Sequence, residues 1–399
     1  MLLRRPRSLI RLATLVVTVA FSWFALSGVH LGEAWRALRG SDYLWLVPAM
    51  LVLALAMGAR ALRWRSLFAP GRRPPLGAVA NAMMLGYLYN NILPARSGEI
   101  ARVLVLSRRS SAPPIEIAGT AALERLYDVV GVLLIFFLAT PWLPAVAWLG
   151  PAAIAAGALA LAIVAAALVL ARYGERALRT VLSPLRRLPR VSDARLARTS
   201  AELANGLSGL RHPGVALLGL LWTLVAWMLT ALLAYLVSVA FHLQLPFACG
   251  LLVSVAVGLA MILPSPPAAL GVFEAAALIG LKAYGLSHSA ALPYALVLHL
   301  VNFLPFILVG VALLHYNSRH PPAQAAPGSY RGPSFGGLRR YVPRFASGAA
   351  LVPRRALESL GDGLGQELAA GQPEPVQLQA SERAERLQAV YDGGAQADG

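Results

Sequence analysis

The chain has 399 residues, of which 58% are hydrophobic and only 13% are charged, and its mean hydropathy is +0.63. A soluble domain carries about twice that charged fraction, so the composition predicts an integral membrane protein. The formal net charge of +17 does not indicate a nucleic-acid-binding protein, because the arginines lie between apolar runs, as in multi-pass membrane proteins. The single cysteine, Cys249, excludes an intrachain disulfide and a cysteine-based metal cluster.

Six apolar runs are long enough to cross the membrane as helices, which takes about 20 residues. They lie at 8–28, 44–62, 118–140, 150–171, 214–241 and 290–315. The first follows several arginines without a clear cleavage site, so we expect a retained signal anchor rather than a signal peptide. Long continuous runs favour helices over a β-barrel. The predicted fold is therefore an all-α polytopic membrane protein with about six full transmembrane helices.

Two further apolar segments, 76–93 and 250–281, are interrupted. The first ends at Pro94 and Gly98, and the second breaks at Pro264 and resumes before Gly271. Proline and glycine interrupt helices, so we expect two broken or re-entrant segments at these places. Whether each re-enters or crosses the membrane stays open at this point.

The loops predict the orientation. The loops after the second and fourth runs, the latter at 172–213, are rich in arginine, whereas the connections at 141–149 and 242–249 carry no charge. By the positive-inside rule the basic loops are cytoplasmic. We expect a multi-pass protein of the bacterial cell (inner) membrane with its N- and C-termini in the cytoplasm.

With this orientation each half of the chain consists, in order, of two predicted spans, one predicted re-entrant segment and a third span. Three crossings per half give the halves opposite orientations, and inverted repeats with broken helices are typical of secondary transporters. The sequence similarity between the halves is weak, so the repeat is only a possible one. From about 316 the chain becomes polar, and we expect a transmembrane domain at 8–315 and a mostly disordered cytoplasmic tail at 316–399.

Three groups of polar residues lie next to or within apolar segments. The candidates for binding a headgroup are Asn91, Arg96, Glu99, Arg102, Glu124, Arg125, Asp128 and Glu274. The arginines offer planar donors suited to phosphate, and charges within a span usually face a cavity or one another. The alternatives are a cytoplasmic turn with snorkelling arginines around Arg96, a structural ion pair around Glu124, and a buried structural carboxylate at Glu274.

Glu274 has no cation within one helical turn, so we expect a distant partner or a protonated carboxyl. His299 shares a helical face with Asn302 in the last span, where such residues more often hold helices together than bind ligands. No nucleotide-binding, metal-binding or nucleophile motif appears in the sequence, and we expect no cofactor.

These residues resemble a known family. Three short motifs are similar to the membrane domain of lysylphosphatidylglycerol synthases and to stand-alone flippase-like proteins. They are Asn91-Ile92-Leu93-Pro94-Ala95-Arg96-Ser97-Gly98-Glu99 with Arg102, Glu124-Arg125 with Asp128, and Leu263-Pro264 with Gly271-Val272-Phe273-Glu274. The resemblance covers about 10–315. It implies a domain that moves an aminoacylated or otherwise modified phospholipid between leaflets.

The chain departs from the synthases in two ways. They carry a sizeable soluble catalytic domain after the membrane part, where this chain has only its polar tail, and the stretch from Pro264 to Ala269 is richer in proline than the family pattern. The expected function is a lipid translocase whose partners are membrane lipids. Two alternatives stay open: an intramembrane lipid-modifying transferase, and an accessory subunit of a separately encoded lipid synthase. A lipid-modifying enzyme is a possible partner. We lean against an enzyme.

Overall fold

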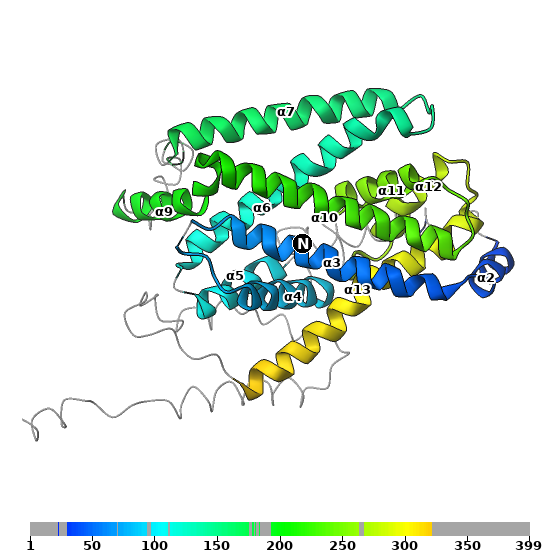
Figure 1. Ribbon diagram of the computed structural model, residues 1–399, viewed down its shortest axis with the longest axis horizontal. Coiled ribbons are helices and arrows are strands. Elements are labelled where there is room, and N and C mark those ends of the chain that lie inside the picture. Colours follow the sequence, from blue (N-terminus) through cyan, green and yellow to red (C-terminus); the bar gives the residue numbers. More distant parts are fainter. Residues whose placement is uncertain are drawn as a thin grey trace, which may run out of the picture. The chain divides into compact units, whose positions relative to one another are not determined.

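The computed structural model describes residues 23, 30–69, 71–93, 97–110, 112–174, 178, 180, 183, 193–262 and 267–320. Within these residues it contains eleven α-helices and no β-strand (Figure 1). The prediction of an all-α membrane protein is confirmed. The predicted first span at 8–28, apart from the helical Trp23, and nearly all of the predicted tail lie outside the described residues.

Four of the helices in the described residues are long and apolar enough to cross a membrane. They are α3 (Leu46–Ser66, preceded by the 3₁₀ turn η2 at Tyr43–Trp45), α7 (Leu149–Tyr173), α10 (Pro213–Ala240) and α13 (His288–Arg319). They correspond to the predicted spans at 44–62, 150–171, 214–241 and 290–315. The predicted span at 118–140 is α6 (Pro114–Ala139), which is long enough but carries Glu124, Arg125 and Asp128.

Each interrupted segment forms a hairpin of two short helices. The first hairpin consists of α4 (Leu76–Ile92) and α5 (Gly98–Arg109), and the second consists of α11 (Phe247–Ala260), the turn η6 (Pro267–Ala269) and α12 (Val272–Lys282). The two helices of each hairpin pack against one another. The predicted segment 76–93 covers only α4, because α5 is too polar to be recognised as part of an apolar run. The predicted breaks at Pro94 and Pro264 lie outside the described residues.

The first hairpin depends on a close approach between its two helices. A Cβ atom added to Gly98 would overlap the carbonyl oxygen of Gly86 and would lie 2.6 Å from Oδ1 of Asn90. The same Asn90 oxygen accepts a hydrogen bond from the backbone N–H of Gly98 at 2.9 Å. Asn90, near the end of α4, therefore caps the start of α5 across the break.

The second hairpin turns at Gly271, whose φ of +80° favours glycine. The carboxylate of Glu274 accepts a hydrogen bond from the backbone N–H of Gly271 at 2.8 Å and so caps α12. Both glycines predicted as helix breaks thus lie at helix starts. Gly98 is required by the close approach of two helices, and Gly271 by its positive φ.

The order of elements repeats along the chain. Helix α2 (Leu31–Arg39), α3, the first hairpin and α6 are followed by α7 and then by α9 (Asp193–Gly206), α10, the second hairpin and α13. The contacts repeat as well: α3 packs on α10, α4 on α13 and α11 on α6, while α2 packs on α13 and α9 on α6. Figure 1 shows α2 and α9 at opposite ends of the paired helices α3 and α10.

Candidate functional site

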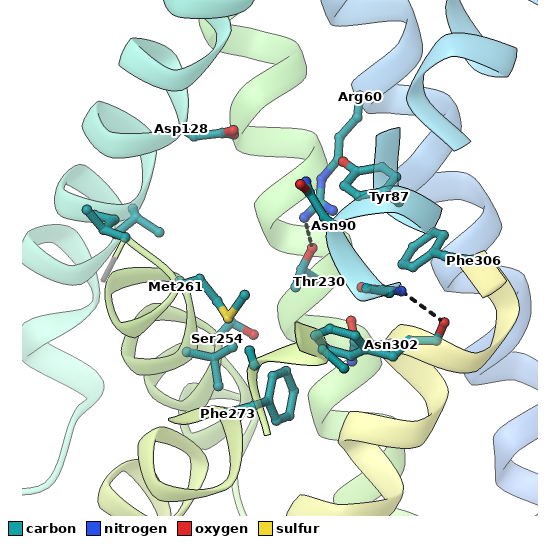
Figure 2. A pocket seen from close by; sticks show the side chains of 18 of the residues that line it. Arg60, Tyr87, Asn90, Asp128, Thr230, Ser254, Met261, Phe273, Asn302 and Phe306 are labelled. Carbon is teal, nitrogen blue, oxygen red and sulfur yellow. Dashed lines mark hydrogen bonds between the residues drawn. The ribbon is translucent and has the colours of Figure 1, made fainter. Parts of the chain in front are cut away.

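A cavity of about 280 Å³ lies where the tips of the two hairpins meet. Residues of both halves line it (Figure 2). Asn90 and Leu93 lie at the end of α4, Ala268 lies in η6, and Phe273 lies at the start of α12. One part of the lining is apolar and aromatic. The polar part consists of Arg60, Tyr87, Asn90, Asn91, Glu99, Arg125, Asp128, Trp227, Thr230, Ser254 and Asn302.

Arg60 extends from α3 into this cavity (Figure 2). Its Nη2 donates a hydrogen bond to the hydroxyl oxygen of Thr230 on α10 at 3.0 Å, and its guanidinium carbon lies 6.0 Å from the ring centre of Trp227. Among the described residues no carboxylate lies within ion-pair distance of Arg60. Asp128, also in the cavity wall, interacts with Arg60 electrostatically from beyond that distance, so the guanidinium faces the cavity without an ion pair of its own.

The other charges of this region form a closed ring of ion pairs, which we call the charge ring. Its members alternate in sign in the order Arg63, Glu124, Arg102, Glu99, Arg125 and Asp128. Arg63 on α3 is fully buried, and its guanidinium lies 2.9 Å from Oε1 of Glu124 and 2.6 Å from Oδ1 of Asp128. Arg63 thereby ties α3 to α6.

The opposite side of the ring ties α5 to α6. Arg102 lies 2.7 Å from Oε2 of Glu124 and 2.8 Å from Oε2 of Glu99. Arg125 closes the ring, with one nitrogen 2.7 Å from Oε1 of Glu99 and the other 3.3 Å from Oδ2 of Asp128. Each charged group of the ring therefore has two partners of opposite sign.

The charge ring divides the predicted site residues into two sets. Glu99, Arg125 and Asp128 line the cavity, and Arg125 is 44% exposed. Arg102 and Glu124 do not line it, and their side chains are 4% and 1% exposed. The ring as a whole is neutral, with three guanidinium groups and three carboxylates, and its members in the cavity wall are two carboxylates and one guanidinium.

Asn91 lies at the tip of the first hairpin and lines the cavity. Its Nδ2 lies 3.5 Å from the carbonyl oxygen of Phe303 on α13, a long contact that a ligand could replace. Arg96 lies in the break outside the described residues.

Glu274 lies just behind the cavity wall. Its Oε1 contacts Nδ1 of His299 on α13, and Nε2 of His299 lies 2.9 Å from the carbonyl oxygen of Ala268. The imidazole stacks on Phe273, with ring centres 4.6 Å apart. Ala268 and Phe273 line the cavity while Glu274 and His299 do not. Of the two expectations for Glu274, a distant partner or a protonated carboxyl, the structure shows a distant partner, His299.

The two contacts of His299 require one proton shared between its imidazole and Glu274. The carbonyl oxygen of Ala268 can only accept, so Nε2 of His299 must carry a hydrogen to bond with it. The contact between Nδ1 and Glu274 then needs a second hydrogen, carried by either the imidazole or the carboxyl group. If that proton leaves, His299 can bond Glu274 or Ala268, but not both.

The two hairpins place comparable groups at comparable positions. In the first, Glu99 in the first turn of α5 meets Arg125, which is 26 residues further along the chain on α6. In the second, Glu274 in the first turn of α12 meets His299, which is 25 residues further along on α13. In both halves a carboxylate on the second helix of the hairpin pairs with a basic side chain of the next long helix.

Reasoning from sequence missed Arg60, Arg63 and His299 as parts of this region. Both arginines are counted with the basic residues that follow the second predicted span, although Arg60 lies within its bounds of 44–62, and α3 continues to Ser66. The available signal was their spacing of three residues on one apolar helix, since charges within a span usually face a partner or a cavity. His299 had been interpreted as a residue holding helices together.

The family described as lysylphosphatidylglycerol synthase TM region matches residues 11–310 of the chain. A UPF0104 membrane protein of Methanothermobacter thermautotrophicus is 22% identical over 307 residues, which cover 73% of this chain and 87% of that relative. The family match extends over the helices that carry the charge ring, both hairpins and the cavity. The chain is a multi-pass integral membrane protein that belongs to the lysylphosphatidylglycerol synthase transmembrane-region family.

Proposed function

We propose that the chain is a lipid translocase that moves a phospholipid or lipid-linked headgroup between the two leaflets of the membrane. The observation that carries the proposal is the cavity of about 280 Å³ between the two hairpin tips, whose lining contains both polar and apolar residues. Its volume is near the lower end of the range for small-molecule sites, about 300–1,000 Å³. Such a cavity suits a headgroup whose acyl chains stay outside it.

The repeated order of elements supports an alternating mechanism. In the proposed topology the hairpin of α4 and α5 enters from the cytoplasm, and the hairpin of α11 and α12 enters from the opposite side. Transporters with inverted repeats bind their substrates near the middle of the membrane, at broken helices. Movement of one tip at a time would open the cavity to one leaflet at a time.

The predicted binding residues take different parts in this proposal. Asn91, Glu99, Arg125 and Asp128 line the cavity and are proposed to contact the headgroup, and Arg96 in the first break is proposed as a further phosphate contact. Arg102 and Glu124 are proposed to position the others through the charge ring, and Glu274 is proposed to control the second tip through His299.

We further propose that the translocase domain spans 8–315, that a polar cytoplasmic tail follows it, and that the protein resides in the bacterial cell membrane with both termini in the cytoplasm. A separately encoded lipid-modifying enzyme is the proposed source of a modified substrate.

The test is translocation by purified protein in sealed vesicles. Fluorescent phospholipids are incorporated, and their accessibility to an external quencher is followed over time. We expect faster exchange between leaflets than in protein-free vesicles. Met261→Trp, which fills the cavity, should slow exchange, whereas Ala166→Trp on the exposed face of α7 should not.

Two results would contradict the proposal. Exchange no faster than in protein-free vesicles, with correctly folded protein, would exclude translocation of the lipids tested. Recovery of chemically altered lipid, detected by mass spectrometry, would instead support an intramembrane transferase.

A further inference from the structure

One charged side chain of the cavity wall, Arg60, has no ion pair among the described residues. Among the described lining residues the charged ones are Arg60, Glu99, Arg125 and Asp128. The last three belong to the charge ring, where each already has two partners of opposite sign. Arg60 has a hydroxyl and an indole ring as neighbours, but no carboxylate within ion-pair distance in the part of the chain that the structure describes.

The sequence of the two breaks outside the described residues adds no negative charge. Neither Pro94 to Arg96 nor Leu263 to Pro266 contains an acidic residue, and the first of them contains a further arginine. Arg60 is half-buried and donates one hydrogen bond to Thr230, which leaves further donors of its guanidinium for an anion. An anion bound beside Arg60 would therefore be stabilised by a charge-assisted hydrogen bond.

We propose that the substrate is a lipid whose headgroup is a phosphate with an uncompensated negative charge, bound by Arg60 with Thr230 beside it. This inference rests on the proposed translocase function and makes its substrate class more specific. Phosphate accepts the planar donors of a guanidinium in pairs. Asn90, Asn91 and Asn302 offer neutral amides for the hydroxyl groups of such a headgroup.

The same geometry disfavours headgroups that carry an amine. An ammonium group requires a carboxylate with free acceptor capacity, and the two carboxylates in the cavity wall, Glu99 and Asp128, are each held between two guanidinium groups. Binding an amine there would require opening the charge ring. A zwitterionic or cationic lipid should therefore move more slowly than an anionic one.

The experiment compares lipid classes in the vesicle assay with the full chain. Fluorescent phosphatidylglycerol and phosphatidic acid provide a diester and a monoester, phosphatidylethanolamine is zwitterionic, and lysylphosphatidylglycerol is cationic. We expect the two anionic lipids to move about tenfold faster than the other two, as one charge-assisted hydrogen bond allows. Faster movement of phosphatidylglycerol would identify a phosphodiester as the preferred headgroup, and faster movement of phosphatidic acid would identify a phosphomonoester.

Variants of α3 test the assignment to Arg60. Arg60→Gln should lower the rate for anionic lipids to that of phosphatidylethanolamine, and Arg60→Lys should keep part of the preference. Arg65→Gln, on the same helix and outside the cavity, should leave the preference unchanged. Size-exclusion profiles and melting temperatures in detergent establish that each variant is folded.

The outcomes separate this inference from the proposed function. Equal or faster movement of phosphatidylethanolamine or lysylphosphatidylglycerol by the wild-type protein overturns the inference and leaves translocation intact. An unchanged preference in Arg60→Gln overturns the role of Arg60. Uptake of water-soluble glycerol phosphate without lipid movement, or no movement of any lipid, overturns the inference together with the translocase function.

Discussion

At the scale of single residues, the charge ring explains how this helical protein keeps strong charges within its packed interior. Arg63 is fully buried, and ions removed from water are stable only when partners satisfy them. The ring pairs Arg63 with Glu124 and Asp128, and it pairs Glu124 with Arg102 as well. These residues thereby act as a scaffold for the cavity wall.

The first prediction concerns Arg63. Arg63→Met should destabilise the protein by about 3–5 kcal/mol, because it leaves buried Glu124 without one of its partners. The double variant Arg63→Met with Glu124→Gln should lose less than the sum of the two single variants, since it removes one charge of each sign. Thermal unfolding in detergent measures both, with Arg65→Met as the control on the same helix. Additive losses would show that the ring does not act as a unit.

The second prediction concerns Glu274. The shared proton makes the contact between His299 and Ala268 dependent on pH: both contacts are kept at low pH, and one is lost as pH rises and the proton leaves. The transport rate of the wild type should therefore change with pH. Glu274→Gln can keep both contacts without titrating, and should give little transport and a flat pH profile while inserting normally.

The control for Glu274 is Glu33→Gln on the exposed side of α2, which should keep the wild-type profile. Near-normal transport with an unchanged pH profile in Glu274→Gln would mean that this carboxylate only caps α12.

At the scale of elements, the hairpins decide where the cavity forms. Each break brings a helix tip into the interior, and the two tips contact one another through α4 and η6. Gly98 permits the first hairpin to close because its missing Cβ leaves room for the backbone of Gly86.

The third prediction tests this close approach. Gly98→Ala should destabilise the protein by on the order of 1–3 kcal/mol, as overpacking does, because the new methyl group would overlap the carbonyl of Gly86. Gly77→Ala at the start of α4 meets nothing within 4 Å and should be neutral or stabilising by up to about 1 kcal/mol. If the melting temperatures of the two variants fell by the same amount, the close packing of α4 and α5 would be contradicted.

The elements differ in how far the sequence could predict them. The spans that became α3, α7, α10 and α13 follow from continuous apolar runs, and the breaks follow from proline and glycine. Helix α5 was missed because its exposed and ring-forming charges hide the apolar pattern. The pairing of Arg63 with Glu124 and of Glu274 with His299 joins residues 61 and 25 positions apart, and only the packing of helices brings such residues together.

At the scale of the whole molecule, the described helices form two sets with the same order and matching contacts. The pairing of α4 with α13 and of α11 with α6 crosses between the sets, so each hairpin packs on the last helix of the other half. An arrangement of this kind gives the cavity one wall from each half.

The fourth prediction concerns the topology. In a variant whose buried Cys249 is replaced by alanine, single cysteines at Arg72 and Arg108 should react with an impermeant thiol reagent only from the cytoplasmic side. Cysteines at Trp35 and Lys282 should react from the outside. Labelling of position 108 from the outside would show that the first hairpin crosses the membrane, and the halves would then not be inverted.

The central claim is that the cavity between the hairpin tips holds a lipid headgroup, and photo-crosslinking in native membranes tests it most directly. A photoreactive amino acid replaces Met261 in the cavity or, as the control, Leu161 on the exposed face of α7, and mass spectrometry identifies the attached lipid. The account predicts that position 261 captures anionic lipids through their headgroups, whereas position 161 captures acyl chains in proportion to the membrane composition. Capture of no lipid at position 261, or of the same mixture as at position 161, would contradict it.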